Sequence, residues 1–186
     1  AARDGHRRYA EPAGLSRQGG GAVNRTVTAQ PPAPDIQYMK EALKEANKGI
    51  KAGDGGPFGC VIVKGDRIAG RGHNRVILKR DPTCHGEMEA IRDACETLGT
   101  YDLAGCVLYT TAEPCPMCLG AILWANIRQV YFGCNREDSD GIGFRDEVFY
   151  KYLKGEADIL SVQQFGRGEC LELFDAYKAL DNKTSY

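Results

Sequence analysis

Two short groups of polar residues constrain this chain more than any other feature of its sequence. The first is Cys84-His85-Gly86-Glu87, and the second is Pro114-Cys115-Pro116-Met117-Cys118. One histidine and a C-x-x-C pair supply three ligands that suit a tetrahedral Zn²⁺ with its fourth position open to water. Glu87 lies too close to His85 to be an independent ligand, but it is well placed to move protons beside the metal. The fold therefore has to bring both groups to one point.

A C-x-x-C pair alone also occurs in redox proteins and in structural zinc sites. A redox pair leaves His85 and Glu87 unexplained. A structural zinc site needs a fourth ligand, and the remaining histidines are poor candidates because His6 is in the N-terminal tail and His73 is at a strand end. The two groups together therefore favour a catalytic zinc site.

Hydrophobic periodicity predicts how the two groups are positioned. Residues 58–63 and 68–72 are expected to form two strands joined by a hairpin turn, and residues 106–111 a buried strand. Helices are expected to start at His85 and at Cys115, so that each half of the site begins a helix. The positive end of a helix dipole stabilises a thiolate, which suits Cys115 as a ligand.

The other segments complete an α/β pattern. Asp35 is a candidate N-cap for a helix with apolar residues at Met39, Leu43, Ala46 and Ile50. Strands are expected at 129–133 and 159–164, and a helix at 147–153. A last helix has Cys170, Leu173, Phe174, Tyr177 and Leu180 on one face. This alternation predicts a three-layer α/β/α fold with a five-stranded mixed sheet and helices on both faces.

Residues 1–34 differ from the rest of the chain. They contain five arginines, a Gly-Gly-Gly run and a Pro-rich stretch, and they lack hydrophobic periodicity. Such a segment cannot bury enough surface to offset the entropy of ordering, so we expect a disordered extension followed by one domain over 35–186. An organelle transit peptide is the alternative interpretation.

Charge and cysteine usage narrow the class of protein. The formal net charge of −1 and the pI near 6.4 argue against a dedicated nucleic-acid partner. No apolar run approaches the roughly 20 residues that span a bilayer. Eight cysteines are spread along the chain, and the expected state is buried free thiols in the cytoplasm, with Cys115 and Cys118 kept for metal. The other cysteines on apolar faces are Cys60, Cys95, Cys106 and Cys170.

The order His-x-Glu followed by Pro-Cys-x-x-Cys is the pattern of zinc deaminases that act on bases. On these residues the chain resembles the cytidine-deaminase-like zinc hydrolases. Over about residues 36–186 it is most similar to bacterial guanine deaminases and plant guanosine deaminases within that superfamily. This narrower resemblance rests on Gly55-Gly56-Pro57-Phe58-Gly59, Asp81-Pro82-Thr83, Ala90-Ile91-Arg92, Leu108-Tyr109-Thr110, Met117-Cys118-Leu119-Gly120-Ala121-Ile122, Gly143-Phe144-Arg145-Asp146 and the C-terminal Tyr186.

The resemblance implies a zinc-dependent hydrolytic deaminase. His85, Cys115 and Cys118 would hold Zn²⁺, and a water activated there would attack the ring carbon that bears the amino group. Glu87 would take the proton of that water, pass it to a ring nitrogen and protonate the departing ammonia. The reaction most favoured is guanine to xanthine plus ammonia.

Five further residues would contact the base by the same resemblance. They are Asn74, Phe58, Asp146, Trp124 and Tyr186. Each internal one has a structural alternative: Asn74 can cap a strand end, Phe58 and Trp124 can belong to the core, and Asp146 can be the N-cap of the next helix.

The resemblance also implies a homodimer, in which the C-terminal segment crosses to the active site of the partner. Departures at Gly86, Ala112 and Arg145 leave the substrate open. Cytosine is one alternative, because His-Gly-Glu also occurs in fungal cytosine deaminases. A tRNA adenosine deaminase and a non-catalytic zinc-stabilised binding module are the others.

Overall fold

The computed structural model describes residues 33–183 and builds them around one mixed β-sheet. Its strands are β1 (Gly59–Lys64), β2 (Arg67–His73), β3 (Cys106–Ala112) and β4 (Gln129–Cys134), in the order β2-β1-β3-β4. Strand β1 is antiparallel to β2 and to β3, whereas β3 and β4 are parallel. The tight β1–β2 hairpin uses Gly65 at φ 62°, and a parallel pair requires the helical crossover that lies between β3 and β4.

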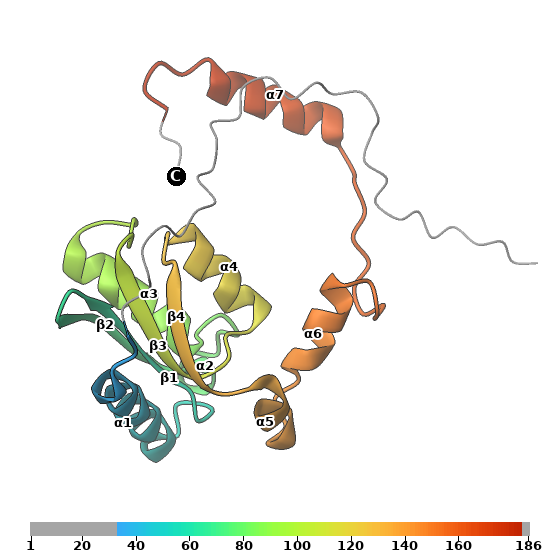
Figure 1. The fold of residues 1–186 in the computed structure, drawn as a ribbon. Coiled ribbons are helices and arrows are strands. Elements are labelled where there is room, and N and C mark those ends of the chain that lie inside the picture. Colours follow the sequence, from blue (N-terminus) through green and yellow to red (C-terminus); the bar gives the residue numbers. More distant parts are fainter. Residues whose placement is uncertain (1–32, 184–186) are drawn as a thin grey trace, which may run out of the picture. The chain divides into compact units, whose positions relative to one another are not determined.

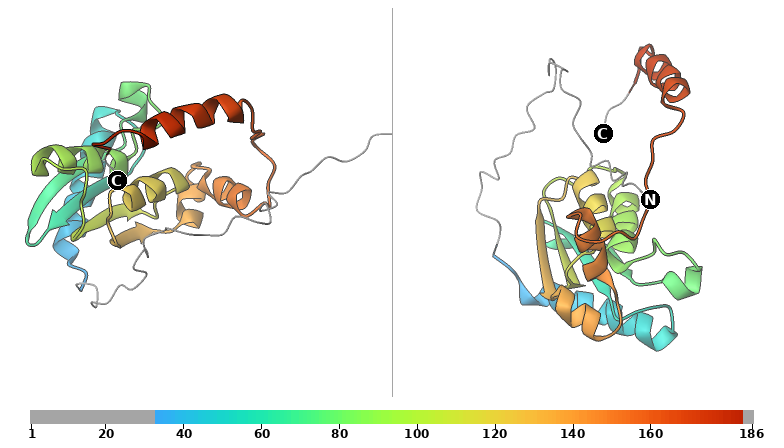
Figure 2. Two further views of the ribbon diagram at one scale, coloured as in Figure 1. Left: turned by 90° about the horizontal axis from the view of Figure 1, so that it is seen from above. Right: turned by 90° about the vertical axis from the view of Figure 1, so that its right-hand side faces the viewer.

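Helices cover the two faces of the sheet unequally (Figures 1 and 2). Helix α1 (Ile36–Ala52) packs on one face, against Val61, Val63 and Tyr109. Helices α3 (Gly86–Leu98) and α4 (Pro116–Trp124) enclose the larger core on the other face. Both α3 and α4 start where the chain leaves the same end of the sheet, which brings their N-termini together.

Glycines in the strands allow the helices to approach closely. A Cβ at Gly59 would lie 2.2 Å from the Ala42 carbonyl oxygen of α1, and one at Gly72 would lie 2.3 Å from the Gly86 carbonyl oxygen of α3. Any larger side chain at these positions would push a helix off the sheet. Because Gly86 starts α3, the contact at Gly72 fixes the helix end that follows His85.

Four shorter or more peripheral helices complete the described chain. They are α2 (Val76–Lys79), α5 (Arg136–Gly141), α6 (Asp146–Leu153) and α7 (Arg167–Lys178). The predicted helices at 147–153 and at the C-terminal end are confirmed, but α2 and α5 were not predicted. Helix α5 is short and polar, and a capping box between Asn135 and Asp138 specifies its start instead of an apolar face.

The expected fifth strand is absent from the described chain, so the sheet has four strands there instead of five. Residues 159–164 adopt no regular structure, and Ile159, Leu160 and Val162 are exposed. The alternating apolar pattern favours a strand, but a strand also needs a neighbour to pair with, and none of the four described strands pairs with this segment.

Two details of burial also differ from expectation. Leu43 and Ile50 of α1 are exposed, because the close approach of Gly59 turns Ala42, Ala46 and Gly49 toward the sheet. Cys170 is exposed as well, along with the apolar face of α7. The expected disordered extension falls mostly outside the described residues.

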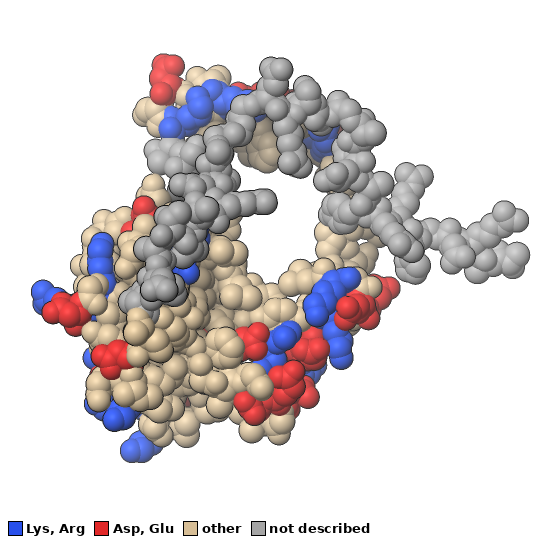
Figure 3. Space-filling model, in the orientation of Figure 1, with Lys and Arg blue, Asp and Glu red and all other residues tan. Residues whose placement is uncertain are grey.

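Charged side chains lie mainly at the rims of the molecule and over α5 and α6, whereas the surface over β4 is largely uncharged in the view of Figure 3. Among the described residues, no helix has the length and hydrophobicity needed to cross a membrane.

Candidate metal centre and active site

Three side chains converge where α3 and α4 begin. His85 is the N-cap of α3, Cys115 is the N-cap of α4, and Cys118 follows in the first turn of α4. The His85 Nδ1 atom lies 3.6 Å from the Cys115 Sγ atom and 3.7 Å from the Cys118 Sγ atom. A tetrahedral zinc with ordinary Zn–N and Zn–S bonds separates such ligand atoms by about 3.6 Å. The donor set therefore fits zinc in both chemistry and spacing, as predicted for this cluster.

The electrostatics of this cluster favour a thiolate. A hydrogen bond from Cys118, opposed by burial and supported by His85, lowers the pKa of Cys115 to about 4. The same thiolate raises the pKa of His85. The pKa of Cys118 is raised, because this thiol shares its proton with Cys115 and is itself buried. The pair thus holds one negative charge before metal binding, and binding a divalent cation would release the second proton.

Glu87 lies beside the three ligands without being one of them. Its side chain is only 5% exposed, and burial raises the pKa of this carboxyl group. The Thr110 hydroxyl donates to its Oε1 atom at 3.1 Å, and the Cys118 Sγ atom is 3.5 Å from its Oε2 atom. A carboxyl group with a raised pKa, held next to a metal site, is suited to accept and return a proton.

A narrow pocket opens onto this cluster. It brings together Glu87, the ligands His85 and Cys115, and the predicted base contacts Asn74, Phe58 and Asp146. Its free interior is about 30 Å³, and its remaining lining residues are Ala112, Glu113 and Phe144.

Asn74 is buried at the end of β2, and its side chain has a structural partner. The Oδ1 atom accepts a hydrogen bond from the backbone N–H of Val76 at 3.2 Å. This bond fixes the amide plane and leaves the amide N–H groups able to donate to a ligand. The two interpretations of Asn74, as a strand-end cap and as a base contact, are thus compatible.

Asp146 does not cap its helix. The N-cap of α6 is Arg145, and Asp146 is the first helical residue, so the capping alternative is wrong. Burial, followed by the nearby Cys115 thiolate, raises the pKa of Asp146. This is a partly desolvated carboxyl group facing the pocket, where it can accept hydrogen bonds from a ligand.

The aromatic wall of the pocket consists of two rings. Phe58 and Phe144 pack edge to face, with centroids 4.6 Å apart and an interplanar angle of 86°. A Cβ at Gly56 would come within 2.6 Å of the Phe144 ring, so a glycine is needed to seat that ring. Phe144 and Glu113 were given no role from the sequence, although Phe144 belongs to the Gly143–Asp146 motif and Glu113 directly precedes the Pro-Cys-x-x-Cys group.

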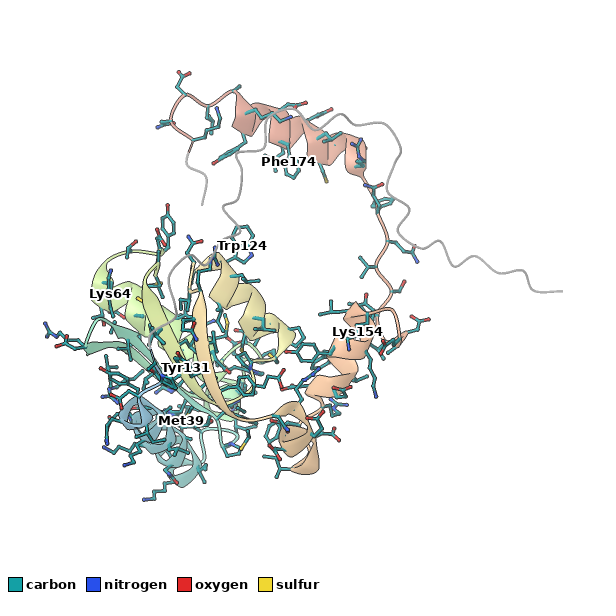
Figure 4. All side chains as sticks on the ribbon, viewed as in Figure 1. Met39, Lys64, Trp124, Tyr131, Lys154 and Phe174 are labelled. Carbon is teal, nitrogen blue, oxygen red and sulfur yellow. The ribbon has the colours of Figure 1, made fainter. Side chains whose placement is uncertain are left out.

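Trp124 does not reach this pocket, contrary to expectation. It lies six residues after Cys118, about 9 Å further along α4, and is 66% exposed (Figure 4). It lines a separate apolar groove of about 510 Å³ between α3 and α4. Tyr186 lies outside the described residues.

Comparisons with known proteins agree with this geometry. The family profile described as the cytidine and deoxycytidylate deaminase zinc-binding region matches residues 32–134. The chain is 43% identical over 151 residues to the guanine deaminase of Bacillus subtilis, a match that covers 80% of this chain and 97% of that protein. It is 44% identical over 99 residues to the tRNA-specific adenosine deaminase of the same organism, which covers 53% of this chain and 61% of that protein.

Solved structures give the same pattern. The X-ray structure of the Bacillus subtilis guanine deaminase superposes with a TM-score of 0.78 at 42% identity, covering 82% of this chain and 99% of that one. A guanine deaminase structure from Nitrosomonas europaea gives a TM-score of 0.57 at 30% identity, covering 68% and 80% of the two chains.

Proposed function

This chain belongs to the cytidine and deoxycytidylate deaminase family, and on that basis we propose that it hydrolyses guanine to xanthine and ammonia. It is a zinc-dependent hydrolytic deaminase of a small nucleobase or nucleoside. The observation that carries the choice of guanine is the position of Asp146 in the pocket. A match that covers 80% of a 186-residue chain has to extend beyond Asp146, so the likeness to guanine deaminase includes this part of the pocket.

Glu87 is the proton carrier in this proposal. His85, Cys115 and Cys118 would hold zinc, which when bound would lower the pKa of a water to about 7. Glu87 would accept a proton from that water and deliver it to a ring nitrogen of the base. It would then take the remaining proton of the hydroxyl group added to the ring carbon and pass it to the amino group, so that the C–N bond breaks and ammonia leaves. Thr110 holds the Oε1 atom of Glu87, which leaves Oε2 as the oxygen nearer the ligands.

Three described side chains are proposed to orient the base. Asn74 would donate from its amide to a ring acceptor, and Asp146 would accept from a ring N–H. Phe58 would stack on the purine, supported by the edge of Phe144. Tyr186, at the C-terminal end of the chain, is also proposed to contact the base.

A tRNA adenosine deaminase is the second candidate, because of the 44% identity to the Bacillus subtilis enzyme. An RNA stem-loop requires a surface that neutralises phosphates. The net charge of −1 does not favour such a surface.

We further propose a homodimer whose C-terminal segment crosses to the partner. The apolar face of α7 is exposed at Leu173, Phe174 and Tyr177, and Leu180 just beyond the helix is exposed as well. An amphipathic helix of this length depends on docking that face. Helix α4 also exposes Leu123, so α4 and α7 both present apolar side chains at the surface. Light scattering at several concentrations tests the dimer, and a monomer at all of them would contradict it.

We also propose that the protein is located in the reducing environment of the cytoplasm. All eight cysteines lie among the described residues and are free thiols. A thiol titration of the protein purified without reductant would check this.

Ammonia release from the zinc-loaded enzyme tests the substrate. Guanine, guanosine, cytosine, cytidine, adenine, adenosine and a tRNA anticodon stem-loop are offered separately. We expect turnover of guanine. Turnover of the stem-loop without guanine would establish the second candidate, and turnover of cytosine alone would show that Asp146 does not select purines.

A further inference from the structure

One face of α6 makes two different contacts with the active site. Asp146 and Tyr150 are four residues apart and therefore lie on the same side of the helix. Asp146 lines the pocket. The Tyr150 hydroxyl donates a hydrogen bond of 2.6 Å to the carbonyl oxygen of Pro114, the residue immediately before the ligand Cys115.

Arg136 of α5 reinforces this connection from the side. Its guanidinium carbon lies 4.5 Å from the centre of the Tyr150 ring. The same side chain pairs with Glu113 Oε1 at 3.2 Å and with Glu147 Oε2 at 3.5 Å. Helices α5 and α6 thus both contact residues 113–114, directly before the first cysteine ligand.

Tyr150 keeps its proton over the whole working range of an enzyme. Burial and the neighbouring Glu113 carboxylate raise the pKa of Tyr150 to about 12. The phenol is therefore a permanent donor to Pro114, and the contact does not switch with pH. Pro114 has no N–H, so its carbonyl is the only backbone hydrogen-bonding group with which this residue can be held.

We propose that Tyr150 is a positioning residue for the deaminase reaction, which holds Asp146 at a fixed distance from the Cys115 ligand through its bond to Pro114. Helix α6 is the spacer, because four residues of α-helix span about 6 Å and resist bending. Arg136 keeps the Tyr150 ring in place by contacting its face. The inference rests on the proposed function in so far as Asp146 contacts the base.

The test compares Tyr150→Phe with Tyr152→Phe in the zinc-loaded enzyme. Tyr152 is a half-buried tyrosine of the same helix on a different face, so its variant controls for the loss of a hydroxyl group. We expect Tyr150→Phe to raise the KM for guanine about five- to tenfold, the effect of losing one hydrogen bond, with a smaller change in kcat. Tyr152→Phe is expected to match the unmodified enzyme.

A double-mutant cycle with Asp146→Asn separates positioning from a merely structural role. If Tyr150 acts through Asp146, the effect of Tyr150→Phe on KM disappears in the Asp146→Asn background. An equal effect in both backgrounds would overturn the proposal.

The second readout needs no substrate. Release of zinc to an excess of chelator is followed for the unmodified enzyme, Tyr150→Phe and Tyr152→Phe. We expect Tyr150→Phe to release zinc several-fold faster than the other two, because the segment that carries Cys115 is less restrained. If guanine is not turned over at all, the proposed function fails, yet faster release would still establish the link between Tyr150 and the ligand loop. Unchanged zinc release together with an unchanged KM would refute the inference.

Discussion

Replacing Glu87 by glutamine separates proton transfer from metal binding. The substitution keeps the shape of the side chain, and its amide oxygen can still accept from Thr110 at the 3.1 Å contact. Since Glu87 is not among the three ligands, we expect one zinc per chain in Glu87→Gln, as in the unmodified protein. Glutamine cannot carry a proton, so hydrolysis loses its general acid and base.

The size of the loss follows from the number of proton transfers. A single positioned acid or base contributes about 10²- to 10⁴-fold to a rate. Glu87 serves as both, so we expect kcat to fall by at least about 10³-fold, which corresponds to about 4 kcal/mol in the barrier. Burial raises the pKa of Glu87, which means that folding with this group ionised is costly above its unfolded pKa. The metal-free Glu87→Gln protein should therefore be no less stable than the metal-free parent at neutral pH.

Glu89→Gln is the matched control. Glu89 is on the same helix and only 7% exposed, but it pairs with Lys79 and Arg92 instead of facing the ligands. We expect it to retain activity within a few-fold. Zinc content is measured by elemental analysis and kcat by ammonia release. Loss of zinc from Glu87→Gln, or near-normal turnover with zinc present, would refute the assigned role.

Three further outcomes are expected. Asp146→Ala should weaken a purine substrate far more than cytosine, as measured by kcat/KM, and equal losses would contradict purine selection. Burial acts to raise the pKa of Glu89, but hydrogen bonds from Lys79 and Arg92 outweigh it and lower the pKa. Glu89 therefore contributes about 1 kcal/mol to the free energy of unfolding above pH about 4.3, the pKa of an unfolded glutamate. This contribution is lost as the pH falls further. The stability difference from Glu89→Gln in urea unfolding should shrink accordingly, and an undiminished difference at pH 3 would contradict it. Gly59→Ala should cost about 3 kcal/mol because its Cβ meets the backbone of α1, whereas Gly120→Ala, with open space around it, should be neutral or stabilising.

The metal ligands could be predicted because their identity is chemical and local. His85, Cys115 and Cys118 each lie at the first turn of a helix, and Pro116 indicates the start of the second of these helices in the sequence. The hairpin around Gly65 and the buried strand β3 were confirmed for the same reason.

The pocket wall could be predicted only in part, because distant segments form it. Phe144 reaches Phe58 through the packing of one loop on another, for which no periodicity exists. Trp124 lies outside this pocket because it is six residues after Cys118 along α4, a separation that its residue type does not reveal. The strand expected at 159–164 shows the same limit: its pattern favours pairing, but pairing depends on a neighbour, and none of the described strands is one.

The separation of the ligands along the chain gives the metal a second role, as a cross-link. His85 and Cys115 are 30 residues apart, on helices that follow different strands. A link that closes a loop of this length removes unfolded-state entropy worth about 3.5 kcal/mol in the treatment used for disulfides. Zinc would then bind the α3 and α4 halves of the core into one cooperative unit, and stripping it should make the chain easier to unfold at the very end of the sheet where the chemistry takes place.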